Sequence, residues 1–317
     1  MSLITKAVYR LDNNRWTTIH TGSNLTALAF SEDKIAVGTA DGYYVIDHNG
    51  KMVESVNKKL PVVKINRLMT VDNKYWFATD EGAFVKQPAR FDYFASKRWL
   101  DQDKIIDMTA DHEGNIYLLT STGLNKIEFL QETLAEKAEY LQNNLRKYHL
   151  RYGFSSASRL TDPEDPTTMR LDDKDNDGLW TSFYLGSQAF RYATTKNERA
   201  REHVWESFEP FERLISIHSI EGFSGRTFER TGYIAGRTEP WRPAPDEDWW
   251  WKGTTSTDEF VAYMFVTAVI DQFVAQTSEE KKRVADYFDA IMNHIVTNDY
   301  YFIDYDGKPT LWGRWNP

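Results

Sequence analysis

Three copies of one sequence pattern constrain the fold of this 317-residue chain more than any other feature. The copies cover residues 25–47, 65–87 and 105–128, and in each a Thr-x-x-Gly turn, at Gly42, Gly82 or Gly123, leads into a further strand. Their runs are rich in β-formers, and a glycine permits the positive φ of a tight hairpin. A period near 40 residues is typical of four-stranded propeller blades, so we predict about three blades in residues 1–128.

The copy YWFATDEG, residues 75–82, resembles most closely the two-component-regulator type of propeller repeat. That repeat has a hydrophobic strand, a polar turn, a second strand rich in Trp or Ile, and then Thr-x-x-Gly. The resemblance implies incomplete β-propeller-like blades, because closed propellers have about four to eight. Either the chain is a fragment of a longer protein, or the open edge packs on a second domain. An open edge would also allow self-association.

Charge and tryptophan divide the chain near Glu128. Acidic and basic residues balance in residues 1–128, so the net charge of −9 belongs to residues 129–317, together with eight of the eleven tryptophans. We therefore predict a second domain over 129–317. The negative charge argues against a nucleic-acid partner. The absence of cysteine excludes disulfides, thiolate metal sites and cysteine nucleophiles, and no apolar run is long enough to span a membrane.

Residues after 128 show helical rather than strand periodicity. The spacing of apolar residues predicts five helices, within residues 130–145, 179–194, 198–217, 258–276 and 279–296. The loops between them are long and rich in Gly, Pro, Trp and Arg, notably 220–255, which indicates a functional surface. Successive antiparallel helix pairs fit an α/α toroid or part of one.

Three strings of the second domain resemble a group of mostly exported bacterial proteins that carry propeller repeats ahead of a helical toroid. The strings are DNDGLWTSFYLGSQAFRYA (175–193), WKGTTSTDE (251–259) and YYFIDYDGKPTLWGRW (300–315). The resemblance implies an α/α toroid that continues past the equivalent of Pro317, and it implies no particular activity. It also suggests an exported origin, whereas the first residues lack a signal-peptide core, so the localisation stays open.

Alternate carboxylates precede the second predicted helix. Asp173, Asp175 and Asp177, followed by Gly178, match the first half of a calcium loop, but Tyr184 stands where an EF-hand has glutamate. Three interpretations are open: a turn that caps the helix, a calcium site of another type, or a catalytic carboxylate at Asp177. No cofactor is required, and calcium is the candidate ion.

Trp249, Trp250, Trp251 and Lys252 form the second candidate. Three adjacent tryptophans cannot all face the core, and exposed indole rings stack on the apolar faces of pyranose sugars. With Trp180, they are predicted to bind substrate. The alternative is a loop fixed to the helices by indole burial.

Two further segments supply candidate catalytic groups. Ser256 and Glu259 have the spacing of a capping box, which would leave Asp258 as the acid or base, although Glu259 is also a candidate. The glycine-containing loop from His218 to Arg226 could place its arginine against a carboxylate ligand. The alternative there is a structural loop whose arginine pairs with a nearby acid.

These candidates support a carbohydrate-active protein with a Trp-lined acidic cleft in the helical domain. A glycoside hydrolase would use two carboxylates, such as Asp177 and Asp258. A polysaccharide lyase would use Arg226 to neutralise a uronate and Tyr233 or His218 to transfer a proton. The alternative is a non-catalytic module that binds a glycan or senses it, and a purely structural role is the third hypothesis.

Overall fold

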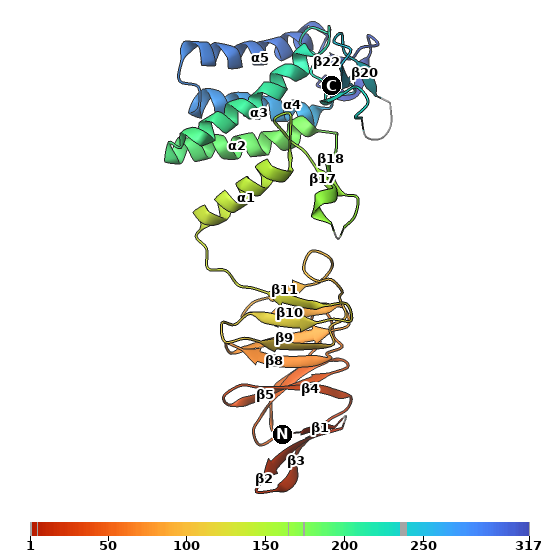
Figure 1. The fold of residues 1–317 in the computed structure, drawn as a ribbon, viewed down its shortest axis with the longest axis vertical. Helices are drawn as coiled ribbons and strands as arrows, with labels where there is room; N and C mark the ends of the chain where they lie inside the picture. Colours follow the sequence, from red (N-terminus) through yellow and green to blue (C-terminus); the bar gives the residue numbers. More distant parts are fainter. Residues whose placement is uncertain (1, 5, 164, 174, 235–239, 317) are drawn as a thin grey trace. The chain divides into compact units, whose positions relative to one another are not determined.

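The computed structural model describes every residue except 1, 5, 164, 174, 235–239 and 317 (Figure 1). The chain divides into two compact units, Met1–Gln131 and Glu132–Pro317. Antiparallel sheets make up the first unit, and helices joined by loops and short strands make up the second. The chain thus combines a β part and an α part, in the predicted order.

Four antiparallel sheets follow one another through the described part of the first unit, each built from strands consecutive in sequence. The first and last have three strands and the two between have four. The strands are β1 (Ser2–Ile4), β2 (Ala7–Asp12), β3 (Arg15–Thr21), β4 (Leu25–Phe30), β5 (Lys34–Thr39), β6 (Gly42–Asp47), β7 (Met52–Asn57), β8 (Arg67–Val71), β9 (Lys74–Thr79), β10 (Gly82–Lys86), β11 (Phe91–Phe94), β12 (Asp107–Ala110), β13 (Ile116–Leu119) and β14 (Leu124–Ile127).

Each predicted repeat forms the first three strands of one sheet: β4–β6, β8–β10 and β12–β14. Two features of these sheets were not predicted from the repeats. Strands β7 and β11 add a fourth strand to the middle sheets, and β1–β3 form a further sheet ahead of the first repeat. None of the sheets formed by described residues closes into a barrel, and the propeller remains a proposal for these residues.

The Thr-x-x-Gly turns hold the second and third strands of each repeat together. The Thr79 hydroxyl donates to the Gly82 carbonyl at 2.7 Å and accepts from the Glu81 amide at 3.0 Å. Gly82 has φ +116°, and a Cβ there would lie 2.5 Å from a backbone oxygen, so the turn requires glycine. Gly42 is similar, with φ +113°. Gly123 does not have a positive φ, so the third turn does not use the conformational freedom that glycine permits.

The core of the first unit lies between successive sheets. Tyr43 of the second sheet packs edge-on to Phe77 of the third, which stacks on Phe84 with ring centroids 4.6 Å apart. All three rings are almost fully buried. Each sheet is therefore stabilised mainly by the apolar face it shares with its neighbours.

Five helices form the described body of the second unit, with bounds within a few residues of the predicted ones. Helix α2 packs against both α3 and α4, and α5 packs against α4 (Figure 1). Antiparallel pairs such as α2–α3 and α4–α5 occur in α/α toroids. The described helices do not close a ring, however, and the toroid remains a proposal. The helices are α1 (Leu134–Tyr148), α2 (Asp177–Thr195), α3 (Glu198–Ser216), α4 (Thr257–Phe273) and α5 (Ser278–Thr297).

Short strands lie between these helices and after α5, and β15, β19, β20 and β21 carry some of the polar residues of the candidate site. The tryptophan segment is one of these strands, β21, and not the predicted loop. Of the predicted loop 220–255, residues 235–239 lie outside the described residues. Among the described residues, the strands and a 3-10 turn are β15 (Leu150–Arg151), β16 (Phe154–Ser155), β17 (Ser158–Leu160), η1 (Pro166–Thr168), β18 (Met169–Leu171), β19 (Thr227–Arg230), β20 (Trp241–Pro243), β21 (Trp249–Lys252), β22 (Tyr301–Ile303) and β23 (Pro309–Arg314).

Candidate functional site

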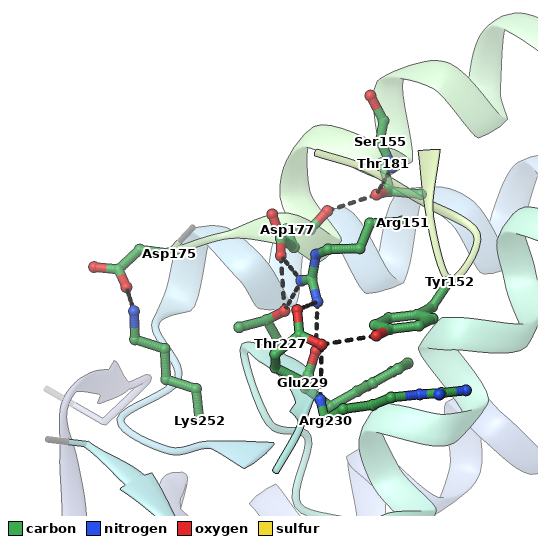
Figure 2. Close-up of polar contacts among 11 residues, drawn as sticks. Arg151, Tyr152, Ser155, Asp175, Asp177, Thr181, Thr227, Glu229, Arg230 and Lys252 are labelled. Atoms are coloured by element: carbon green, nitrogen blue, oxygen red, sulfur yellow. Dashed lines mark hydrogen bonds and ion pairs between the residues drawn. The ribbon is translucent and has the colours of Figure 1, made fainter. Parts of the chain in front are cut away.

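A buried group of charged side chains lies beneath the first turn of α2. Arg151 of β15 pairs with Asp177 through one guanidinium nitrogen and with Glu229 through another, the second contact at 3.0 Å (Figure 2). Thr227 of β19 donates to the same Asp177 oxygen at 2.7 Å, and Tyr152 donates to Glu229 at 2.7 Å. Strands β15 and β19 are thereby tied to the start of α2.

Asp177 is completely buried within this group. Burial raises the pKa of its carboxyl, whereas the Arg151 charge and the Thr227 hydrogen bond oppose that rise. A fully buried carboxylate that is paired with a buried guanidinium has the surroundings of a structural ion-pair partner. The predicted catalytic role of Asp177 is therefore not favoured by its surroundings.

Glu259, in the first turn of α4, is also completely buried. Its Oε2 accepts from the Leu179 amide at 3.1 Å, which satisfies a free N–H at the start of α2. Burial raises the pKa of Glu259 to about 8, so the carboxyl is largely protonated at neutral pH. The capping-box prediction is wrong: Ser256 is the N-cap of α4 but makes no side-chain cap bond, and Glu259 serves the neighbouring helix instead.

A network of hydrogen bonds joins the starts of α2 and α4 above these acids. Arg226 donates to the Ser256 hydroxyl at 3.1 Å and to the side chain of Asn176, which in turn donates to Asp258 at 2.9 Å. Asn176 has φ +67°, a left-handed conformation that asparagine tolerates. The structure therefore brings Arg226 and Asp258 close together, next to buried Asp177 and Glu259. Of these three predicted acids, only Asp258 is exposed.

Lys252, at the end of β21, forms an ion pair with Asp175, separate from the Arg151 group in Figure 2. The Arg226 guanidinium lies 3.9 Å from the same Asp175 carboxylate. Lys252 also lies 5.7 Å from the Trp241 ring centroid. The predicted substrate-binding lysine is thus held by an acid and an indole.

The tryptophan strand is less exposed than predicted. Trp251 is buried, whereas Trp249 and Trp250 are half-buried, so the interpretation of indole burial describes this segment better than a sugar platform. The guanidinium of Arg213 lies 3.9 Å from the Trp249 ring, and Tyr152 meets that ring edge-on. Trp180 differs, because it projects from α2 and is 54% exposed.

The two predicted proton-transfer groups lie in different surroundings. His218 packs against Trp251 with ring centroids 4.4 Å apart, and burial lowers the pKa of its imidazole to about 4, so the ring is neutral at neutral pH. Tyr233 lies on an exposed turn after β19, where its backbone N–H donates to the Arg230 carbonyl at 3.0 Å.

Metal binding finds little support in the described residues. Asp175 faces Lys252 and Asp177 faces Arg151 and Thr227. Among the residues whose placement is described, no three His, Asp or Glu side chains gather in a way suited to a metal ion. Calcium binding by Asp173, Asp175 and Asp177 stays a prediction.

One cavity combines predicted site residues with two that the sequence did not single out. It has a volume of about 400 Å³ and is lined by His218, Trp251, Arg242 and Tyr305, together with Ile220 and the 243–245 segment. The Arg242 guanidinium stacks 3.9 Å from the centroid of the Tyr305 ring. Arg242 lies on β20, and Tyr305 lies after β22, 63 residues further along the chain. This separation explains why no local sequence pattern indicated the pair.

Comparison with known proteins gives limited likenesses. No protein-family model and no curated protein matches this chain. Among solved structures, the extracellular domain of the proposed one-component system BT4673 of B. thetaiotaomicron matches with 14% identity and a TM-score of 0.30, over 33% of this chain and 15% of that one. The extracellular domain of the proposed hybrid two-component system BT3049 matches with 20% identity and a TM-score of 0.31, over 38% and 21%. This chain therefore covers about a fifth or less of each structure. No helix among the described residues is long and apolar enough to cross a bilayer.

Proposed function

We propose that this chain is a non-catalytic module that binds a saccharide in the cavity beside Trp251. The observation that carries the proposal is the stacked pair of Arg242 and Tyr305 in the lining of a cavity of about 400 Å³. Cavities that hold small molecules typically have volumes of roughly 300–1,000 Å³.

The lining of this cavity suits the two kinds of surface that a sugar presents. Aromatic rings and the apolar residues of segment 243–245 pack against the C–H faces of a pyranose, while the Arg242 guanidinium donates N–H groups to its hydroxyls.

The same lining argues against catalysis there. No carboxyl group occurs among the described residues that line the cavity, whereas glycoside hydrolysis uses two. The acids predicted for hydrolysis lie in the helix-start network, where Asp177 and Glu259 are completely buried. For a lyase, Arg226 would act with Tyr233 or His218, yet neither Arg226 nor Tyr233 is among the described residues that line this cavity.

Titration with a panel of neutral and uronate oligosaccharides, followed by calorimetry, tests the proposal. We expect binding without new reducing ends or unsaturated products. Arg242→Ala and Tyr305→Ala should each weaken binding at least about tenfold. Tyr140→Ala, which removes an equally accessible ring from α1, should leave it unchanged. Turnover that Asp258→Asn abolishes would instead establish the hydrolase hypothesis, and unchanged binding by both cavity variants would exclude this cavity.

A further inference from the structure

Helix α2 presents an uncharged stripe to solvent. Apart from Thr195 at its C-terminal end, the exposed positions of α2 are spaced three or four residues apart, so they share one face, and none of them is charged. Trp180 is 54% exposed, Phe183 63% and Phe190 45%. Ordinary surface helices place charged residues on this face, so the α2 stripe has the composition of an interface. The stripe consists of Trp180, Phe183, Ser187, Phe190 and Thr194.

Helix α4 extends the same surface. Between Asp258 and Asp271 its exposed positions are Val261, Phe265 and Ala268, so this helix is apolar nearly all round. Helices of that kind are normally covered on every side. The Phe265 ring lies so close to Gly186 that a Cβ there would be 2.7 Å from it, which joins the two helices into one surface. We call the α2 stripe plus these three α4 residues the α2–α4 face.

A groove borders the α2–α4 face on the side of α1. Its volume is about 630 Å³, and its lining includes Leu141 and Leu145 of α1 with Ser187, Phe190 and Thr194 of α2. The bulky projecting rings, Trp180 and Phe183, stand near one end of the stripe, whereas the groove flanks the other end. Small Ser187 lies between the two ends and would allow another helix to approach closely.

We propose that the α2–α4 face pairs two copies of this chain about a twofold axis near Ser187. In that arrangement the two α2 helices run antiparallel, and the Trp180 and Phe183 rings of each copy enter the groove beside Phe190 of the other. A twofold interface requires such a self-complementary surface. The proposal is independent of the saccharide site, which uses other residues.

Charge favours the α2–α4 face as the place where two copies meet. The net charge of −9 belongs to residues 129–317, so charged surfaces of two second units would repel each other, whereas the α2–α4 face is uncharged. Its four aromatic rings, each about half exposed, offer roughly 400 Å² per copy, or about 800 Å² in a pair. The flanking residues and the groove bring the pair to about 1,000 Å², the lower limit for a specific interface.

Analytical ultracentrifugation of the full chain tests the pairing. We expect a mass of about twice 37.0 kDa, and dissociation to the monomer when Trp180 is replaced by glutamate. Trp180→Glu should weaken the dimer by about 30-fold or more. Trp312→Glu is the matched control, because that indole is similarly exposed but lies on β23, and it should leave the dimer unchanged. A monomeric parent chain, or a dimer insensitive to Trp180→Glu, would overturn the proposal.

The absence of cysteine in the chain allows a second, positional test. Ser187→Cys should form a disulfide-linked dimer rapidly under mild oxidation, because the proposed axis places the two residues opposite each other. Ser216→Cys, at the exposed end of α3, is the control and should link slowly. Equal rates for the two variants would show that the copies do not meet at this face.

Discussion

Gly178 lies against Glu259 so closely that a Cβ on residue 178 would come within 2.5 Å of the Oε2 atom. The same Cβ would lie 3.1 Å from the buried ring of Tyr263. Glycine is otherwise unfavourable inside a helix, by about 1 kcal/mol relative to alanine. Its presence in the first turn of α2 therefore reflects the close approach of α4.

Gly178→Ala should consequently destabilise the protein by about 1–3 kcal/mol, even though alanine is the better helix former, because neither Glu259 nor Tyr263 has room to move. Urea unfolding measures the change. Ser187→Ala on the exposed face of α2 is the control and should alter stability by less than about 0.5 kcal/mol. A neutral Gly178→Ala variant would show that the two helix starts separate easily.

Glu259 should make the stability of the second unit fall as the pH rises. Its pKa is about 8 in the folded protein and near 4.5 when unfolded, so between these values the folded state binds more protons. The stabilisation is complete below pH 4.5 and is lost progressively up to about pH 8. The predicted loss is roughly 3–5 kcal/mol.

Comparison of the parent chain with Glu259→Gln isolates this effect, because glutamine keeps the shape but does not titrate. His218, whose pKa is lowered, acts in both proteins and cancels in the difference. We expect the parent chain to lose stability relative to Glu259→Gln between pH 5 and 8. Parallel pH profiles for the two proteins would refute a raised pKa at Glu259.

The sequence predicted the sheets and helices well because their signals are local. The residues that form a Thr-x-x-Gly turn are neighbours in the sequence, and the apolar residues that mark one face of a helix are three or four positions apart. Strand β7 was not predicted because its residues, Met52 and Val53 included, are mostly exposed and do not alternate between apolar and polar. The sheet β1–β3 was not predicted because it lacks the Thr-x-x-Gly turn that marks the other three sheets.

The candidate site was less predictable because its contacts are long-range. No sequence pattern indicated a role for Arg151, yet it pairs with Asp177 and with Glu229, which is 78 residues away. The spacing of Ser256 and Glu259 predicted a local capping box, but Glu259 instead bonds to an amide 80 residues away on α2. Local patterns identify which residues are polar, and the packing of helices decides which polar residues meet.

Arg151 should be far more important for stability than its exposed counterparts. Arg151→Met would leave the buried Asp177 and Glu229 carboxylates without a cation, which should cost about 3–5 kcal/mol. Lys282→Met is the control: both side chains of its pair with Asp286 are exposed, and the loss should be at most about 1 kcal/mol. Chemical denaturation monitored by tryptophan fluorescence compares the two, and similar losses would contradict the structural role of Arg151.

Thr79 provides the last prediction, in the first unit. Its buried hydroxyl makes two hydrogen bonds within the Thr-x-x-Gly turn, so Thr79→Val leaves the Glu81 amide and the Gly82 carbonyl without that partner. We expect a loss of about 1–3 kcal/mol. Thr70→Val is the control, since the buried Thr70 hydroxyl makes no hydrogen bond with the described residues, and valine should there be neutral or stabilising. Thermal unfolding measures both changes. Equal effects of the two substitutions would mean that the turn threonine acts through its shape and β-propensity and not through its hydroxyl.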